Sequence, residues 1–106
     1  MIAHNVYFTL NDNSAAAIER LLAAAKKYLT GHPGTTFFAV GTRAAELNRP
    51  VNDRDFDVAL QVVFESMAAH DEYQQSERHK AFLAENKGNW KKVRVFDASV
   101  KDESGK

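Results

Sequence analysis

The stretch that decides the fold runs from Phe56 to Phe82 and reads FDVALQVVFESMAAHDEYQQSERHKAF. Its first part alternates between apolar and other side chains, which predicts a β-strand over residues 56–64. The residues expected on one face of this strand are Phe56, Val58, Leu60, Val62 and Phe64.

The second part of the stretch predicts a helix that is broken once. Ser66 has a side chain suited to cap a helix that starts at Met67 and carries Tyr73. After Ser76 a second short helix is expected, which carries His79. The strand and the broken helix would bring a phenol hydroxyl and an imidazole to the edge of one apolar layer.

The composition indicates one domain with no charge bias. The chain has 106 residues, with 14 basic and 14 acidic side chains, so no net charge would attract nucleic acid or an anionic membrane surface. It contains no cysteine, which excludes disulfides and thiolate metal sites. No apolar run approaches the length of about 20 residues that spans a bilayer. We therefore expect a cytoplasmic protein with no cofactor.

The remaining elements follow from periodicity and turn residues. Expected strands cover 2–10, 35–43 and 90–100, an expected helix covers 15–29, and the broken helical region covers 67–86. Residues 44–55 form a long loop, and 101–106 form a tail expected to be flexible outside the domain of residues 2–100. The order β-α-β-β-α-β predicts an α+β fold of the ferredoxin-like type, with a four-stranded antiparallel sheet and helices on one face.

The parity of the strands assigns residues to the two faces of this sheet. The face expected beneath the helices holds His4, Val6, Phe8, Phe38, Val40, Leu60, Val62, Val93 and Val95. The opposite face holds Tyr7, Thr9, Phe37, Ala39, Ala59, Gln61, Val63, Arg94 and Phe96. This second face is too apolar to remain in water, and the sequence supplies no further layer to cover it. We therefore predict a homodimer formed through the open face of the sheet.

Several segments together resemble the stress-responsive dimeric α/β-barrel (Dabb) domain. They are the opening His4-x-Val6-x-Phe8, the strand over 56–64 followed by Glu65-Ser66, the pattern from Tyr73 through His79 to Phe82, and the closing strand over 90–96. The resemblance implies two ferredoxin-like subunits whose sheets close a dimeric barrel. Most members of the family have no assigned reaction.

The resemblance also implies a candidate site. A plant polyketide cyclase of this family uses a tyrosine and a histidine in a cavity between sheet and helices, and these match Tyr73 and His79. Two further family histidines are replaced here, one by Val58 and the other, in a His-Pro pair, by Ser76. The residues expected to line a cavity are His4, Val6, Phe8, Phe38, Val40, Leu60, Val62, Phe82, Trp90 and Val93.

The sequence leaves two functions open. The favoured one is a homodimeric module that binds a small apolar or aromatic molecule in this cavity, or that has a purely structural role. The alternative is a cofactor-free acid–base enzyme of the cyclase or isomerase kind, in which His79 is the base and Tyr73 donates a hydrogen bond to the developing oxyanion. Neutral His79 is expected because it lies in the first turn of a helix.

The other histidines carry no functional expectation of their own. His4 is expected in the core, His32 in an exposed turn, and His70 on a solvated helix face. No two histidines have the i, i+4 spacing of a helical metal site, so no metal is expected.

Overall fold

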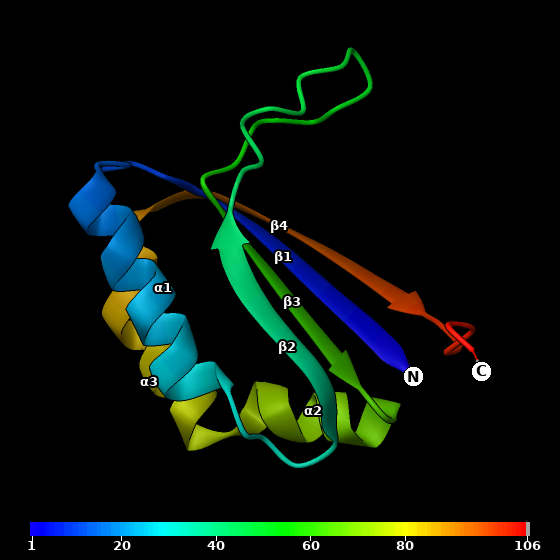
Figure 1. The fold of residues 1–106 in the computed structure, drawn as a ribbon. Helices are drawn as coiled ribbons and strands as arrows, with labels where there is room; N and C mark the ends of the chain where they lie inside the picture. Colours follow the sequence, from blue (N-terminus) through cyan, green and yellow to red (C-terminus); the bar gives the residue numbers. More distant parts are fainter. Residues whose placement is uncertain (106) are drawn as a thin grey trace.

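The sheet is organised around its first strand. The computed structural model describes residues 1–105 of the chain, in which β1 (Ile2–Leu10) pairs antiparallel with β3 (Val58–Phe64) on one side and with β4 (Trp90–Ser99) on the other. β2 (Thr35–Thr42) pairs antiparallel with the outer side of β3, so that the strand order is β2-β3-β1-β4 (Figure 1).

All of the helices lie on one face of this sheet (Figure 1). α1 (Ala15–Leu29) follows β1, while α2 (Met67–Gln75) and α3 (Glu77–Asn86) follow β3, and a 3-10 turn, η1 (Lys87–Asn89), leads into β4. The predicted ferredoxin-like βαββαβ fold is thereby confirmed. Within residues 1–105, every helix is too short or too polar to cross a membrane.

One serine ends the first of the two helices that carry the candidate site residues and begins the second. The hydroxyl of Ser76 donates to the carbonyl of Tyr73 (2.9 Å), which ends α2, and accepts from the backbone N–H of His79 (3.1 Å), which begins α3. Each contact satisfies a backbone group that a helix end leaves free. The predicted break in the helical region at Ser76 is therefore confirmed, and so is Ser66 as the N-cap of α2.

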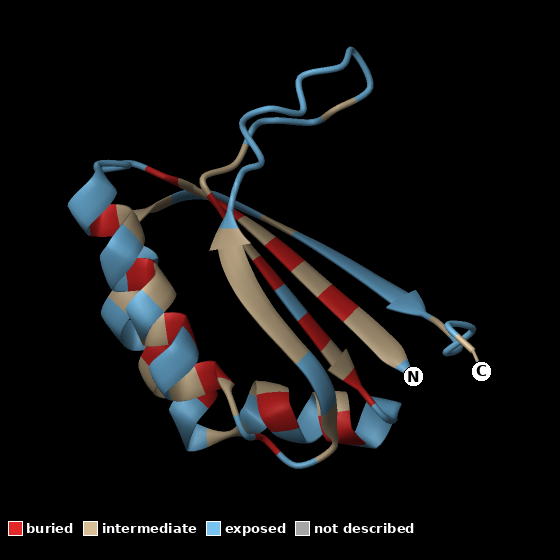
Figure 2. Cartoon of the chain, in the orientation of Figure 1, coloured by how far each residue is buried: buried red, intermediate tan, exposed pale blue. Residues whose placement is uncertain are grey.

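The core lies between the helices and the inner face of β1 and β3. Every second residue of these strands is buried, which appears as the red bands on both strands in Figure 2. The buried strand residues are His4, Val6, Phe8, Leu10, Val58, Leu60, Val62 and Phe64. α1 packs Leu21, Ala25 and Leu29 against them. The predicted alternation is confirmed over residues 4–10 and 58–64, including the inward position of His4.

The predicted strand over 56–64 is two residues shorter than expected. Asp57 interrupts it, because its backbone N–H donates to the carbonyl of Phe8 (2.7 Å) and its carboxylate accepts from the N–H of Leu10 (2.8 Å). Phe56 therefore leaves the alternation, and its ring packs edge-on against Tyr7, on the opposite face of the sheet (centroids 5.0 Å apart). The assignment of Phe56 to the inner face was wrong.

The opposite face of the sheet carries exposed aromatic side chains. Phe37 is 53% exposed and Phe96 is 55% exposed, and the ring of Tyr7 lies 5.9 Å from that of Phe96. The second half of the loop over residues 43–57 is held beside these aromatic side chains. The guanidinium of Arg94 forms a bidentate pair with the carboxylate of Asp53 in this loop (2.5 and 3.3 Å). Among residues 1–105 no helix covers this face (Figure 1).

Replacement of Gly34 by alanine should destabilise the fold more than the same change at other turn glycines. Gly34 has φ +81°, and a Cβ at this position would overlap the Cβ of Ala69 in α2. Gly31 has φ +74° but no atom within 4 Å of such a Cβ, and Gly88 has neither constraint. Gly31→Ala should cost about 1–2 kcal/mol, Gly34→Ala about 1–3 kcal/mol more, and Gly88→Ala little. Urea denaturation measures this order, and equal losses at Gly31 and Gly34 would contradict it.

Candidate functional site

Tyr73 is the centre of a cluster that contains three of the four histidine rings of the chain. Its side chain projects from α2 into the core and is 1% exposed. Its ring centroid lies 4.9 Å from that of His79, 5.0 Å from His32 and 5.9 Å from His4, and the ring of Phe64 packs against it at 4.8 Å. The structure thus brings together the predicted pair, Tyr73 and His79, with His4 beside them.

His32 belongs to this cluster, although the sequence predicted it to be in an exposed turn. Its side chain is buried, and its Nε2 lies 2.8 Å from the carbonyl of Tyr28 in the last turn of α1. That carbonyl has no partner within the helix, so a ring N–H that reaches back to it caps the helix end. The turn after α1 therefore folds inward and places His32 against Tyr73, and the prediction was wrong.

His70 is also less exposed than the sequence predicted. Its side chain is 17% exposed, and its ring packs 5.2 Å from the ring of His4 and 5.8 Å from that of Phe64. Its Nδ1 lies 3.1 Å from a carboxylate oxygen of Asp71 at the surface. His70 is therefore half-buried beside the core, while its neighbours Asp71 and Glu72 are exposed, and the prediction of a solvated His70 was wrong.

A cavity of about 200 Å³ lies beside Tyr73, between the sheet and α3. Of the residues expected to line a cavity, it contains His4, Val6, Phe8, Leu60, Phe82, Trp90 and Val93, together with Tyr73 and His79. The sequence prediction missed four further lining residues, which are Leu29, Gln74, Leu83 and Val95. The first three lie on helices, and periodicity alone did not show which helical residues would line the cavity.

Three of the expected lining residues do not contact this cavity. Phe38 and Val40 lie on β2, at the far edge of the strand order β2-β3-β1-β4, where they pack against the core. Val62 is fully buried on β3. They share the inner face with the lining residues, as predicted, but the strand residues that line the cavity come from β1, β3 and β4 and not from β2. There Val93 and Val95 remain 37% and 49% exposed.

Polar atoms without a partner occur beside this cavity. Within residues 1–105, Nδ1 of His79 and Nε1 of Trp90 are buried and make no hydrogen bond. By contrast, Nδ1 of His4 lies 2.6 Å from a carboxylate oxygen of Asp97, and its Nε2 lies 3.4 Å from the amide nitrogen of Gln74. These contacts fit the tautomer in which His4 carries its proton on Nδ1.

Burial shifts the pKa of both predicted catalytic residues. It raises the pKa of Tyr73 far above its usual value, so the hydroxyl stays protonated and can donate a hydrogen bond. It also lowers the pKa of His79 from 6.5, and the charges that His4, His32 and His70 acquire on protonation lower it further. The sequence predicted a neutral His79 from its place at the start of α3, and the structure gives burial as the larger cause.

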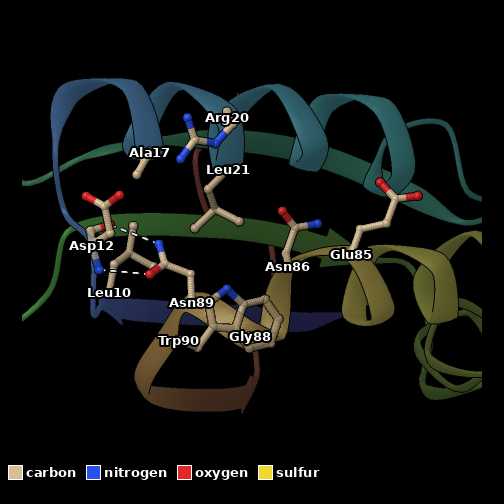
Figure 3. A pocket seen from close by; sticks show the side chains of 10 residues that line it. All are labelled: Leu10, Asp12, Ala17, Arg20, Leu21, Glu85, Asn86, Gly88, Asn89 and Trp90. Atoms are coloured by element: carbon tan, nitrogen blue, oxygen red, sulfur yellow. Dashed lines mark hydrogen bonds between the residues drawn. The ribbon is translucent and has the colours of Figure 1, made fainter.

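A larger cavity lies between α1 and the end of α3, and several of its polar groups already have partners. It has a volume of about 290 Å³ and is shown in Figure 3. The side chain of Asn89 accepts from the backbone N–H of Asp12 (2.8 Å) and donates to its carbonyl (2.9 Å). Glu85 accepts from the hydroxyl of Tyr28. These pairs connect elements of the fold, and no aromatic acid–base pair lies among them.

His79 should titrate below pH 6.5 in the folded protein. Because the unfolded chain takes up this proton first as the pH falls, the stability that neutral His79 contributes is present above about pH 6.5 and is lost as the pH falls towards the folded-state pKa. Proton NMR of the ring would follow the titration. His79→Gln should flatten the pH dependence of the unfolding free energy in that window, whereas a pKa at or above 6.5 would contradict the burial argument.

Comparison with known proteins supports the assignment of the fold. A Dabb family protein with a ferredoxin-like fold from Mesorhizobium loti is 26% identical, over 94% of this chain and 96% of that chain, with a TM-score of 0.77. A dimeric ferredoxin-like protein of unknown function from Thermobifida fusca is 19% identical, over 93% and 90% of the two chains, with a TM-score of 0.76.

An enzyme is also among the solved structures that share this fold. The hydroxynitrile lyase from Passiflora edulis is 21% identical, over 95% of this chain and 94% of that chain, with a TM-score of 0.75. No curated protein matches the chain at a significant level. The family model of the stress responsive A/B barrel domain matches residues 2–100. The chain therefore belongs to the stress-responsive α/β-barrel (Dabb) family.

Proposed function

We propose that this protein is a homodimeric module that binds a compact aromatic or apolar molecule with one polar group. The observation that carries the proposal is the unpartnered Nδ1 of buried His79 at a cavity whose other walls are mostly apolar. A buried polar atom without a hydrogen bond costs about 1–3 kcal/mol. A ligand that offers a hydrogen-bonding group at this point would recover that cost.

The size of the cavity restricts the ligand. Its volume of about 200 Å³ is below the roughly 300 Å³ at the low end for drug-sized ligands. A single ring with a hydroxyl or carbonyl group is therefore a better fit than a fused polycycle. A ligand would enter the cavity at the exposed edge of the sheet, beside Val93 and Val95 of β4.

Small aromatic probes should change the fluorescence of Trp90, which lines the cavity and is the only tryptophan in the chain. Phenol and benzaldehyde carry the polar group that the site would pair, and toluene has the same ring without it. We expect His79→Gln to weaken binding of phenol and benzaldehyde by about fivefold, which corresponds to one hydrogen bond of about 1 kcal/mol. Toluene binding should change less.

A matched variant distinguishes the two cavities that Trp90 contacts. Arg20 lines only the cavity between α1 and α3, so Arg20→Ala should leave the response to all three probes unchanged. Loss of the response in Arg20→Ala, or an equal effect of His79→Gln on toluene and phenol, would contradict the proposed site.

A second candidate function is acid–base catalysis on a carbonyl compound without a cofactor. It is favoured by the lowered pKa of His79, which leaves a neutral base at physiological pH, next to the protonated hydroxyl of Tyr73. The same fold occurs in the hydroxynitrile lyase from Passiflora edulis, so the architecture is compatible with an enzyme. A compound that binds to wild type and His79→Gln alike but is converted only by wild type would establish this function over simple binding.

The homodimer is proposed from the open face of the sheet. Phe37 and Phe96 are more than half exposed there, and Tyr7, Phe56 and Arg94 frame a hollow of about 320 Å³. An apolar face of this kind is rarely left in water. A second copy of the same sheet would cover it by a two-fold contact. The solved neighbour from Thermobifida fusca is described as dimeric, which agrees with this arrangement.

Phe96→Asp should convert the dimer to a monomer, because it places a charge within the proposed apolar contact. Phe96 is 55% exposed in the single chain, so the fold itself should remain intact by circular dichroism. Met67→Asp is the matched control, since Met67 is equally exposed at 55% but lies on the helical side. Sedimentation velocity would measure both variants. A monomeric wild type, or a Phe96→Asp variant that remains dimeric, would overturn the proposed interface.

A further inference from the structure

We propose that His4, His70 and Asp97 form a binding site for a divalent transition-metal ion. One potential ligand atom from each of these residues lies within 4.8 Å of the other two. The three come from β1, α2 and β4, which are far apart in the sequence, so no spacing rule applied to the sequence detects them. The site departs from the expectation that the chain holds no metal.

The distances require only a small adjustment around an ion. Nδ1 of His4 and Oδ1 of Asp97 are already 2.6 Å apart, and the rings of His4 and His70 have centroids 5.2 Å apart. Ligand atoms about 2.0–2.2 Å from a zinc ion lie roughly 3–3.5 Å from one another. Asp97 is 48% exposed, so its carboxylate can move the short distance away from Nδ1 that an ion between them requires, whereas His70 is 17% exposed and already packs beside His4. His4, which is 6% exposed, is the fixed ligand.

The groups around the three ligands also suit a metal site. Metal-binding histidines usually donate their other ring N–H to a carboxylate or an amide. Nδ1 of His70 lies 3.1 Å from Oδ1 of Asp71, which leaves Nε2 for the ion. Nε2 of His4 lies 3.4 Å from the side-chain nitrogen of Gln74, so Nδ1 is left for the ion, and the Gln74 amide has to turn its oxygen towards Nε2 once that nitrogen carries the ring proton. His70 therefore has a carboxylate partner in place for the nitrogen that the ion does not use, and His4 gains an amide partner when the Gln74 side chain turns its oxygen inward.

Open space beside the cluster allows water or another small ligand to complete the coordination. A cavity of about 150 Å³ is lined by Ile2, Met67, His70, Asp97, Ala98 and Ser99. An ion with three protein ligands and one open position is the usual arrangement at zinc sites that interact with small molecules. Two imidazoles and one carboxylate favour zinc, cobalt, nickel or copper over magnesium or calcium, which prefer oxygen ligands.

This site shares His4 with the proposed ligand cavity but is otherwise formed by different residues. His70 and Asp97 do not line that cavity, and His4 faces it while presenting Nδ1 to Asp97. Binding of an ion and binding of an aromatic molecule can therefore be tested independently, and failure of one does not imply failure of the other.

Calorimetric titration of the tag-free protein with zinc chloride tests the proposal. We expect one zinc ion per chain and no heat of binding with magnesium chloride. His70→Ala and Asp97→Asn should each weaken zinc binding by about tenfold or more, since even loss of an outer partner of a metal ligand costs about 10–100-fold. Asp102→Asn is the matched control, because it removes another exposed carboxylate near the end of β4 and should change nothing.

Cobalt provides a second readout that is sensitive to the ligands. Cobalt bound by these residues should give visible absorption bands, and Asp97→Asn should alter them. Asp97→Asn keeps the size of the side chain at an exposed strand position, so the fold should be retained. The proposal is overturned if wild type binds no zinc, or if His70→Ala and Asp97→Asn both bind zinc as tightly as wild type does.

Discussion

Burial of the Tyr73 side chain is the constraint on which the rest of this structure depends. The side chain is 1% exposed, and its ring contacts rings from β1, the turn after α1, β3 and α3. α2 must therefore lie close against the sheet, and Ser76 must turn the chain sharply so that α3 can return over the same region. The same packing excludes water from His79. The environment that lowers the pKa of His79 and raises that of Tyr73 is thus a consequence of how the helices are held on the sheet.

This packing leaves polar atoms that the fold itself does not satisfy. Most buried donors and acceptors in proteins have a hydrogen-bond partner, and each exception calls for an explanation. Within residues 1–105, His79 and Trp90 both have an unpartnered ring nitrogen; His79 lines only the smaller cavity, whereas Trp90 lines both. The polar groups in the cavity between α1 and α3 differ, because Asn89 and Glu85 connect neighbouring elements there. His79, which lines the smaller cavity and not the larger one, therefore favours the smaller cavity as the place where a ligand would be recognised.

Alternation and capping chemistry predicted the parts of the structure that depend on nearby residues. Alternation placed His4 on the inner face of β1 and put Phe37 and Phe38 on opposite faces of β2, and the serine side chain predicted the cap at Ser76. Alternation could not say where along the sheet a cavity would lie, and so Phe38 and Val40 of β2 were expected at a cavity whose strand residues come from β1, β3 and β4. The environments of His32 and His70 were missed for a related reason. Each is decided by a contact with a distant element, namely the ring of Tyr73 for His32 and that of His4 for His70.

The position of His4 connects the two sites proposed for this protein. Its ring has one nitrogen towards Asp97 and the other towards Gln74 at the ligand cavity. While Nδ1 donates its proton to Asp97, Nε2 presents a lone pair on the cavity side. An ion bound to Nδ1 would reverse this, because the ring proton would then reside on Nε2 and His4 would offer the cavity a donor. A ligand with a hydrogen-bond acceptor near Gln74 would therefore bind the cavity more tightly when the ion is present. A ligand with a donor there would bind more weakly. By reciprocity, the first ligand would tighten the binding of the ion by the same factor.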